Sequence, residues 1–231
     1  MATSGTFAFT LDLADAMEEA YERCGLELRS GYDYRTARRS LNMLMLEWQN
    51  RGLNLWTVKN ASQTLTAGTS TYALTAEKLE IVEAVCRTDE GNASLQADLS
   101  MTRISVSTYS QQTNKLTDGR PIQYFVERTP SNLNIVVWPV PDSAKTYIFN
   151  YYYIERIEDA GTTASLNMDV PARYLPCLTA GLAYYISMKK PEAQSLAPML
   201  KQVYDEQWEM ASDAAREKAS FQVSPGGYSN L

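Results

Sequence analysis

Residues 42–56 read NMLMLEWQNRGLNLW. Between Met43 and Trp48 the only polar residue is Glu47, and Gly52 follows a few positions later. A helix over this run would be apolar on most of its sides, and glycine commonly ends a helix. A second tryptophan, Trp56, follows the glycine almost at once. The pattern predicts a helix buried on more than one side, followed directly by a change of structure.

Two helices are predicted in the N-terminal part of the chain. The first covers about residues 11–24, where apolar residues recur at helical spacing, with Thr10 as its N-cap and Gly25 after its end. The second covers about residues 34–51, and Asp33 would cap it. Because each helix has an apolar stripe that it cannot bury alone, the two should pack against further elements.

Helical spacing returns near the C-terminus. Asp169 precedes Pro171, an arrangement that favours the start of a helix, and Pro191 would end that helix. Gly181 lies in its middle, where glycine costs about 1 kcal/mol relative to alanine. We therefore expect another helix to approach closely at this glycine. A last, long helix is predicted over about residues 192–219.

The stretch between the two helix pairs is rich in β-branched and aromatic residues, which is typical of strands. Residues 55–65 and 69–75 flank the turn sequence Thr-Ala-Gly, and this arrangement predicts a hairpin. A short helix is predicted around residues 105–110. Further strands are predicted at residues 79–88, 121–128 and 132–138.

Residues 145–156, KTYIFNYYYIER, give the strongest strand prediction. Both faces of this strand would be mostly apolar, so we expect it to be central or sandwiched. Its three consecutive tyrosines could suggest a stacking platform for single-stranded nucleic acid. Adjacent strand residues point to opposite faces, however, so the three rings cannot form one platform.

The predicted fold class is α+β. The N- and C-terminal helix pairs would form a four-helix antiparallel bundle, with an inserted β-rich domain that is sandwich- or barrel-like. Pro225, Gly226 and Gly227 prevent the last helix from continuing, so a flexible C-terminal tail is expected. The predicted domains are residues 1–54 and 161–219 for the helical domain, 55–160 for the β-rich insertion and 220–231 for the tail.

Composition excludes several classes of protein. The chain has 231 residues, no histidine, three scattered cysteines and a formal net charge of −6. Without histidine there can be no Ser-His or Cys-His nucleophile, and the commonest zinc ligand is missing. The cysteine spacing does not indicate a disulfide framework or a metal site. The sequence has no signal-peptide pattern and no run long enough to span a membrane, so we expect folding in the cytoplasm.

Carboxylates are the only catalytic equipment that the sequence offers. The candidate groups are Glu18 with Glu19, Glu155 with Glu158 and Asp159, and Asp205 with Glu206 and Glu209. One alternative function is therefore a carboxylate-dependent cell-wall hydrolase. Another is a DNA-binding module that uses Arg35, Arg38 and Arg39, although the acidic net charge argues against it. Nucleotide-binding motifs are absent, so we expect no cofactor and no enzymatic activity.

Several segments resemble the head-to-tail adaptor family of short-tailed phages, also called the connector or packaged-DNA-stabilisation family. The resemblance covers about residues 10–215, and its segments occur in the order of the family. It is carried by YERCGLE (21–27), ARRSLNMLMLEWQNRGLNLWTV (37–58), GRPIQYFVER (119–128), VVWPVPD (136–142), YYY (151–153) and VPARYLPCLTAGLAYYISMKKP (170–191).

The resemblance implies a structural protein of the virion. Adaptors of this family form a ring, typically of twelve copies, beneath the portal at the capsid vertex. The ring extends the DNA channel, retains the packaged genome and provides the surface on which tail nozzle or tail-tube subunits assemble. Genomic DNA would pass through the lumen without specific binding, and no membrane would be involved.

Six residues are predicted to bind partners or to support the interfaces, because aromatic residues and arginine are common anchors at interfaces. Trp48, Arg51 and Trp56 would fix the junction between the bundle and the β-rich domain. Trp208, Phe221 and Tyr228, on the last helix and the tail, would reach the portal.

Overall fold

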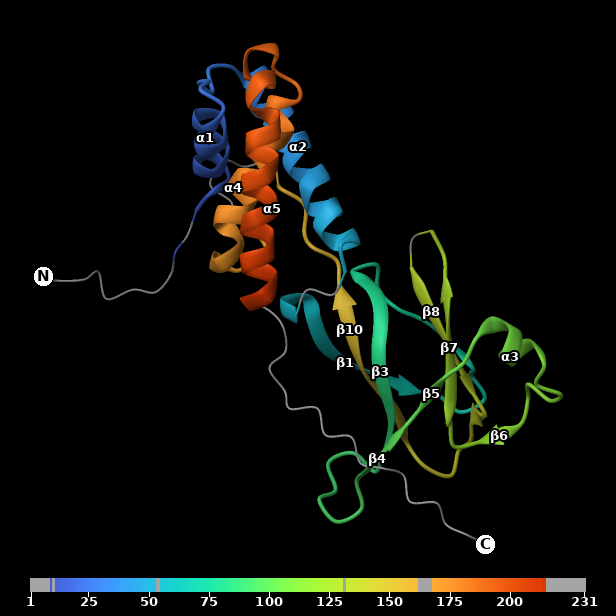
Figure 1. Ribbon diagram of the computed structural model, residues 1–231. Helices are drawn as coiled ribbons and strands as arrows, with labels where there is room; N and C mark the ends of the chain where they lie inside the picture. Colours follow the sequence, from blue (N-terminus) through green and yellow to red (C-terminus); the bar gives the residue numbers. More distant parts are fainter. Residues whose placement is uncertain (1–8, 10, 53–54, 131, 162–167, 215–231) are drawn as a thin grey trace, which may run out of the picture. The chain divides into compact units, whose positions relative to one another are not determined.

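The computed structural model describes residues 9, 11–52, 55–130, 132–161 and 168–214 (Figure 1). The chain divides into two compact units. Unit 1 comprises Met1–Leu44 and Ala160–Leu231 and carries helices, whereas unit 2, Met45–Asp159, carries the strands. The predicted α+β class is confirmed.

The helices of unit 1 gather around α4 (Leu175–Ser187), which contacts both α1 (Leu13–Arg23) and α5 (Ala197–Ala214). α2 (Gly31–Asn50) begins in the same unit. Residues all around α4 are buried, so this helix is the centre of the unit. They are Cys177, Leu178, Thr179, Ala180, Gly181, Leu182, Ala183, Ile186 and Ser187.

Gly181 lies where three helices meet. A Cβ atom at this position would lie 2.8 Å from Cε2 of Tyr204 in α5 and 2.9 Å from Cδ1 of Leu44 in α2. Real Cβ atoms do not approach other heavy atoms that closely, so only glycine fits without a shift of its neighbours. The expected close approach of another helix at Gly181 is therefore confirmed for two helices.

The N-termini of the first two helices differ from the sequence predictions. Thr10, which was predicted to cap α1, lies outside the described residues. The N-cap is Asp12, whose side chain accepts a 2.9 Å hydrogen bond from the amide of Asp15. The prediction that Asp33 caps α2 is wrong. Ser30 precedes the helix, and its hydroxyl accepts the amide hydrogen of Asp33 at 3.2 Å, so the helix begins at Gly31.

The carboxylate of Asp33 has a different task, which is to tie α2 to the end of α4. It accepts a hydrogen bond from Nζ of Lys190 at 2.6 Å and another from the Ser30 hydroxyl at 2.6 Å. These hydrogen bonds, first that from Lys190 and then that from Ser30, lower the pKa of Asp33. The same pair raises the pKa of Lys190.

The last helix begins later than predicted, because a 3₁₀ helix precedes it, and its predicted end at residue 219 lies outside the described residues. Residues Pro191–Leu196 form a 3₁₀ helix, η3, and α5 begins at Ala197. Pro198 lacks an amide hydrogen and its ring would clash with the carbonyl of residue 194, which prevents one continuous α-helix. The residues after Ala214 lie outside the described part of the chain. A second 3₁₀ helix, η2 (Ala172–Tyr174), precedes α4.

Unit 2 contains two four-stranded sheets and one small two-stranded sheet. The first has the order β1-β10-β3-β4 and is antiparallel throughout; the second has the order β2-β8-β7-β5, in which only the β5–β7 pair is parallel. β6 and β9 form the parallel small sheet. The elements are η1 (Leu55–Thr57), β1 (Val58–Leu65), β2 (Thr71–Ala73), β3 (Lys78–Thr88), β4 (Ala97–Ser100), β5 (Thr102–Arg103), α3 (Val106–Ser110), β6 (Asp118–Gly119), β7 (Gln123–Arg128), β8 (Leu133–Trp138), β9 (Val140–Pro141) and β10 (Tyr147–Glu155).

The predicted hairpin between the first two strands is wrong. β1 pairs with β10 and β2 pairs with β8, so the two strands belong to different sheets. The turn between them is held by the Tyr72 hydroxyl, which accepts from the amide of Thr66 at 2.9 Å and lies 2.8 Å from the carbonyl oxygen of Thr69. Gly68 within this turn has a φ of +77°, a conformation that favours glycine. The turn therefore passes the chain from one sheet to the other.

β10 is central, as predicted, because it lies between β1 and β3. Its buried face presents Tyr147, Phe149, Tyr151 and Tyr153 to the core. The rings of Phe149 and of Tyr124 in β7 meet edge-on with centroids 5.2 Å apart, so the two large sheets share one core. On the opposite face Tyr152 is exposed, which confirms that the three consecutive tyrosines do not form one platform.

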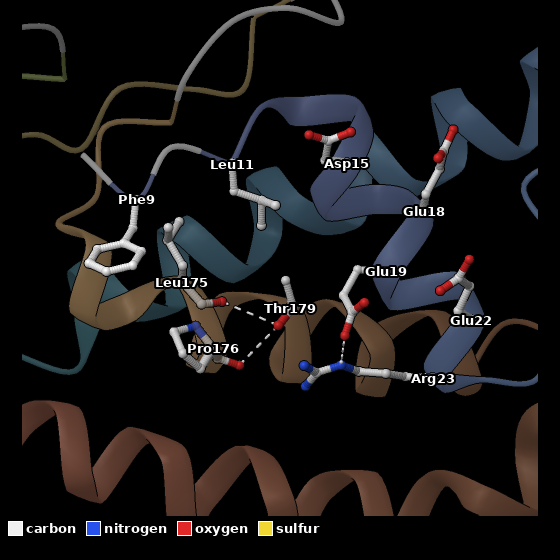
Figure 2. Close-up of a pocket in the computed structure, with 10 residues that line it drawn as sticks. All are labelled: Phe9, Leu11, Asp15, Glu18, Glu19, Glu22, Arg23, Leu175, Pro176 and Thr179. Atoms are coloured by element: carbon white, nitrogen blue, oxygen red, sulfur yellow. Dashed lines mark hydrogen bonds and ion pairs between the residues drawn. The ribbon is translucent and has the colours of Figure 1, made fainter. Parts of the chain in front are cut away.

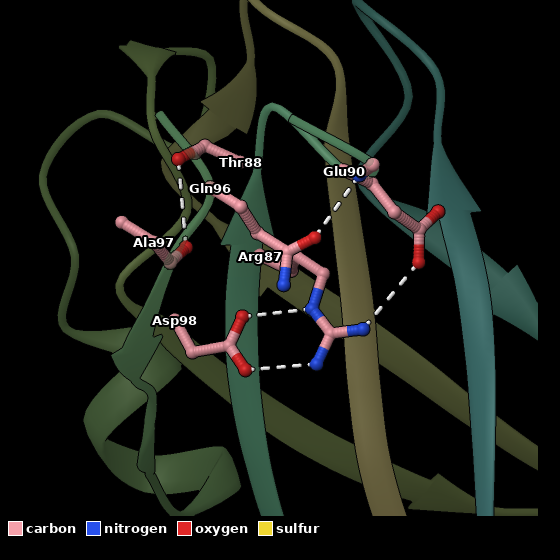
Figure 3. A network of polar contacts seen from close by, with 7 residues as sticks. Arg87, Thr88, Glu90, Gln96, Ala97 and Asp98 are labelled. Carbon is pink, nitrogen blue, oxygen red and sulfur yellow. Dashed lines mark hydrogen bonds and ion pairs between the residues drawn. The ribbon is translucent and has the colours of Figure 1, made fainter. Parts of the chain in front are cut away.

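An ion-pair network secures β4 at the outer edge of the first sheet (Figure 3). Arg87 of β3 donates two hydrogen bonds of 2.8 Å to the two carboxylate oxygens of Asp98 in β4. The same guanidinium reaches Glu90 at 3.4 Å, and the amide of Gly91 donates to Gln96 at 3.0 Å. These contacts close the long turn between the two strands and fix the geometry of the edge.

We expect the substitution Gly181→Ala to destabilise the protein. Alanine favours a helix by about 1 kcal/mol over glycine, but overpacking a core costs about 1–3 kcal/mol. The clash with Leu44 and Tyr204 should therefore lower the free energy of unfolding by about 1–2 kcal/mol, measured by urea titration. Gly31→Ala is the matched control, since a Cβ atom there would meet nothing within 4 Å. Equal midpoints for the two variants would mean that Leu44 and Tyr204 move aside freely.

The Asp33–Lys190 pair predicts a specific pH dependence. Because the folded-state pKa of Asp33 lies below its ordinary value of 3.8, its contribution is complete above that value and is lost as pH falls further. Asp33→Asn should therefore lower the free energy of unfolding by about 1 kcal/mol at neutral pH, and this difference should shrink below about pH 4. Denaturant titrations at pH 7 and pH 3 measure it.

The control for this prediction is Glu27→Gln, which removes an exposed ion pair of similar length, 2.8 Å, with Arg29. Both of its side chains are mostly exposed, so the unfolding midpoint should not change. A difference for Asp33→Asn that is the same at pH 7 and at pH 3 would contradict the assignment.

Candidate interaction surfaces

The described residues show no constellation suited to metal binding. Among them, no group of three or more Cys, Asp or Glu residues could hold a metal ion. The three cysteines are buried, and burial raises the pKa of Cys24 and of Cys86 to about 11, so neither thiol is reactive.

Each carboxylate group predicted from the sequence contains residues engaged in ordinary local contacts. Glu19 pairs with Arg23 at 2.7 Å, Glu155 lies 3.7 Å from Lys59, and Asp205 pairs with Lys201 at 3.0 Å. The partners of Glu19 and Asp205 lie one helical turn away along the same helix. Such contacts are typical of solvated helix faces and strand ends, and they do not favour a hydrolase.

α2 is not buried on every apolar side within the chain, which corrects the sequence prediction. Ala37, Leu41 and Leu44 are fully buried on one side. Met43 is 59% exposed and Leu46 is 52% exposed. The apolar residues that fall off the main stripe of this helix are therefore surface residues of the single chain.

An exposed row of side chains follows the first part of α2. Tyr32 is 63% exposed, and Arg35, Arg39 and Met43 follow at spacings of three, four and four residues. Side chains at this spacing lie on one face of a helix. We call these four residues the α2 stripe. It combines two large uncharged side chains with two cations.

The arginines at the start of α2 have no carboxylate partner within the described residues. Nε of Arg35 donates to the carbonyl oxygen of Gly31 at 3.3 Å, and the Arg39 guanidinium donates to the Thr36 hydroxyl at 3.4 Å. Neither these two nor Arg38 forms an ion pair in that part of the chain. The positive charge of the stripe is therefore not neutralised by the described part of the chain.

A further cation lies beside this group. Nζ of Lys189, just after α4, donates to the hydroxyl of Ser40 in α2 at 2.7 Å. Burial lowers the pKa of Lys189, and the nearby charge of Arg39 lowers it further. Lys189 therefore lies close enough to Arg39 for the two positive charges to repel each other.

A groove of opposite character lies between α1 and α4 (Figure 2). Its volume is about 550 Å³. Apolar side chains line one part of it and carboxylates line another, and we call it the α1 groove. Its lining residues are Phe9, Leu11, Asp15, Glu18, Glu19, Glu22, Arg23, Leu175, Pro176 and Thr179.

Only one carboxylate of this groove is neutralised. Glu19 pairs with Arg23 at 2.7 Å, as Figure 2 shows. Asp15, Glu18 and Glu22 are exposed, point away from α4 and have no ion-pair partner among the residues that the structure describes. The outer face of α1 is thus an unneutralised acidic surface beside apolar side chains.

The sequence-predicted partner residues occupy varied positions. Trp48 is fully buried, so its side chain offers no surface to a partner. Arg51 donates to Glu47, one helical turn earlier, at 2.9 Å, and Trp56 is half-buried. Trp208 of α5 is half-buried, and its ring meets that of Tyr174 edge-on at 6.0 Å. The remaining two predicted residues, Phe221 and Tyr228, lie outside the described residues.

The α2 stripe and the α1 groove were not predicted from the sequence. Arg35, Arg38 and Arg39 were noticed as a cluster, but exposure of Tyr32 and Met43 on the same side depends on which other helices pack there. On α1 the sequence indicates only Glu18 and Glu19 as possible catalytic groups, whereas the lack of an ion-pair partner for Asp15, Glu18 and Glu22 within the described residues is a property of the folded chain. The usable signal was the row of polar positions at helical spacing on α1.

No helix within the described residues is both long and apolar enough to span a lipid bilayer. A family model described as SU10 adaptor protein matches residues 11–226, which is nearly the whole chain. No curated protein sequence is significantly similar to the chain. The family match includes residues of both units, the whole α2 stripe and every lining residue of the α1 groove except Phe9.

Proposed function

This chain belongs to the SU10 adaptor protein family, a family of phage head-to-tail adaptors, and from that premise we propose that it is the adaptor of a short-tailed phage. In this proposal twelve copies form a ring between the portal and the tail nozzle or tail tube. The ring extends the DNA channel and retains the packaged genome. The protein is made in the host cytoplasm and acts at the head-tail junction.

The family match over residues 11–226 carries this proposal, because it includes every described element from α1 to α5. A protein of this family is a structural component of the virion that associates with other virion proteins. The surface described above supports association: it combines exposed apolar residues with charges that have no partner within the described chain. An enzyme would need a site of convergent reactive groups, and the family points to a structural protein instead.

The acidic balance of the chain suits the proposed channel. A formal net charge of −6 per copy gives a strongly negative ring. Negative charge repels the phosphate backbone, so DNA would slide along the lumen without specific binding. The negative net charge does not favour the DNA-binding alternative, in which the arginines of α2 would bind the duplex.

Three finer features belong to the same proposal. The four long helices would form an antiparallel bundle around α4, with the β-rich residues 55–160 as an insertion between residues 1–54 and 161–219. Trp48, Arg51 and Trp56 would stabilise the junction between bundle and insertion from within the chain. Trp208, with Phe221 and Tyr228 of the tail (220–231), would contact the portal.

The first test is the native mass of the protein with and without the portal protein encoded in the same genome. We expect the free chain of 25.9 kDa to convert into a portal-bound ring, with twelve copies adding about 311 kDa in all. A portal from an unrelated phage is the control and should bind nothing. A chain that stays unbound in the presence of its own portal would contradict the proposal.

The second test removes residues 220–231. If Phe221 and Tyr228 dock on the portal, the truncated chain should bind the portal at least about tenfold more weakly, since large aromatic side chains carry much of the energy of interfaces. A chain with the same residues in scrambled order keeps length and composition and serves as the control. Portal binding that is unchanged in the truncated chain would remove the tail from the proposal.

A further inference from the structure

We infer that neighbouring copies contact each other head to tail, with the α2 stripe of one copy seated on the α1 groove of the next. This inference rests on the proposed function, because it identifies the surfaces through which the proposed ring closes. The partner that covers either surface is a second copy of this chain. Three observations carry it: exposed apolar side chains, unneutralised charges of opposite sign, and the position of both surfaces on unit 1.

The α2 stripe has the composition of a protein interface. Tyr32 and Met43 are mostly exposed at the two ends of the α2 stripe, and Arg35 and Arg39 lie between them. Large exposed side chains flanked by arginine are the composition that protein interfaces favour. Duplex DNA would accept the arginines but would offer nothing to the methionine. The stripe therefore fits a protein partner with an acidic and partly apolar surface.

The second surface has those two properties. The α1 groove offers Phe9, 76% exposed, together with Leu11, Leu175 and Pro176 as its apolar lining. Beside this lining, the exposed carboxylates of α1 form an acidic outer face. A volume of about 550 Å³ is enough to receive an aromatic ring and a methionine side chain.

Two charged residues on each surface match in spacing. Arg35 and Arg39 lie one helical turn apart on α2, and Glu18 and Glu22 lie one helical turn apart on α1. None of these four forms an ion pair within the described residues, so bringing the surfaces together would neutralise charges that the described chain leaves open. Charge complementarity of this kind guides association and fixes the register of an interface.

The two surfaces belong to different helices of one unit. Figure 1 draws α1 and α2 on either side of α4 and α5. A contact between two different surfaces is heterologous, and repetition of a heterologous contact produces a closed ring or an open filament rather than an isolated dimer. The ring of the proposed function is one of these two products.

The test exchanges the charges of the two surfaces. One variant carries Arg35→Glu and Arg39→Glu, and the other carries Glu18→Lys and Glu22→Lys. Each variant alone would place like charges in every contact, so portal-bound ring formation should fall at least about tenfold. In an equimolar mixture every contact can again be complementary if the two variants alternate. The mixture should therefore recover ring formation, measured by native mass.

If the mixture recovers ring formation, the single variants fail because their interface is broken, not because the chains are misfolded. Arg29→Glu with Lys201→Glu is the matched control for the arginine variant, because it changes the net charge by the same amount at exposed positions outside both surfaces. This control should form rings like the original chain. Rings from either single variant at the original yield, or a mixture that fails like its components, would overturn the inference while portal binding stands. Loss of DNA affinity without loss of rings would assign the arginines to DNA and would also overturn it.

A second measurement needs no portal, so failure of the proposed interface can be distinguished from failure of the proposed adaptor function. Chains with Arg39→Cys and chains with Glu18→Cys are mixed at high concentration under mild oxidation; the three native cysteines are buried. Mixed disulfide dimers should form several-fold faster than in a control mixture in which Arg29→Cys replaces Arg39→Cys. Such dimers without portal binding would refute the adaptor function but keep the interface. Equal rates in both mixtures, together with no effect of charge exchange, would overturn the inference.

Discussion

The helical unit depends on one close approach, the passage of α4 beside α2 and α5 at Gly181. A single added methyl group would overlap the side chains of both Leu44 and Tyr204. Because α4 is in contact on so many sides, most of its residues are buried, and its first turn, with Leu175 and Pro176, is the part that reaches the α1 groove. The outward faces of the unit therefore belong mainly to α1, α2 and α5.

Those outward faces are sorted by charge. α1 carries carboxylates and the start of α2 carries guanidinium groups, and in the described chain most of these charges meet no opposite charge. Two pairs are exceptions: Glu19 pairs with Arg23 along α1, and Asp33 pairs with Lys190 where α2 is fastened to the end of α4. Charges that stay open at the surface are thus available for association, which supports the adaptor function proposed above.

Periodicity in the sequence predicted most helices and strands, because burial on one face imposes a repeat of 3.6 or 2 residues. It predicted the tight spot at Gly181 for the same reason: a glycine within a helix requires a compensating contact. It failed where partners are distant in sequence. The segment around Tyr72 favoured a local hairpin, yet both strands found partners more than sixty residues away. At Asp33 two residues could cap α2, and Ser30 does so because its hydroxyl reaches the amide of Asp33. Likewise, the exposure of Met43 depends on which helices pack around α2, which no local pattern specifies.

The helical unit is discontinuous: its first part ends at Leu44 and its second begins at Ala160, with the amide of Ala160 donating to Asn42 at 2.8 Å. On the ribosome, the whole β-rich unit therefore emerges before α4 exists. During that interval α4 cannot cover the inward faces of α1 and α2, and the strands can fold first. The order of synthesis thus makes the insertion a folding unit that precedes the helical unit enclosing it in sequence, and α4 completes the latter by arriving last at its centre.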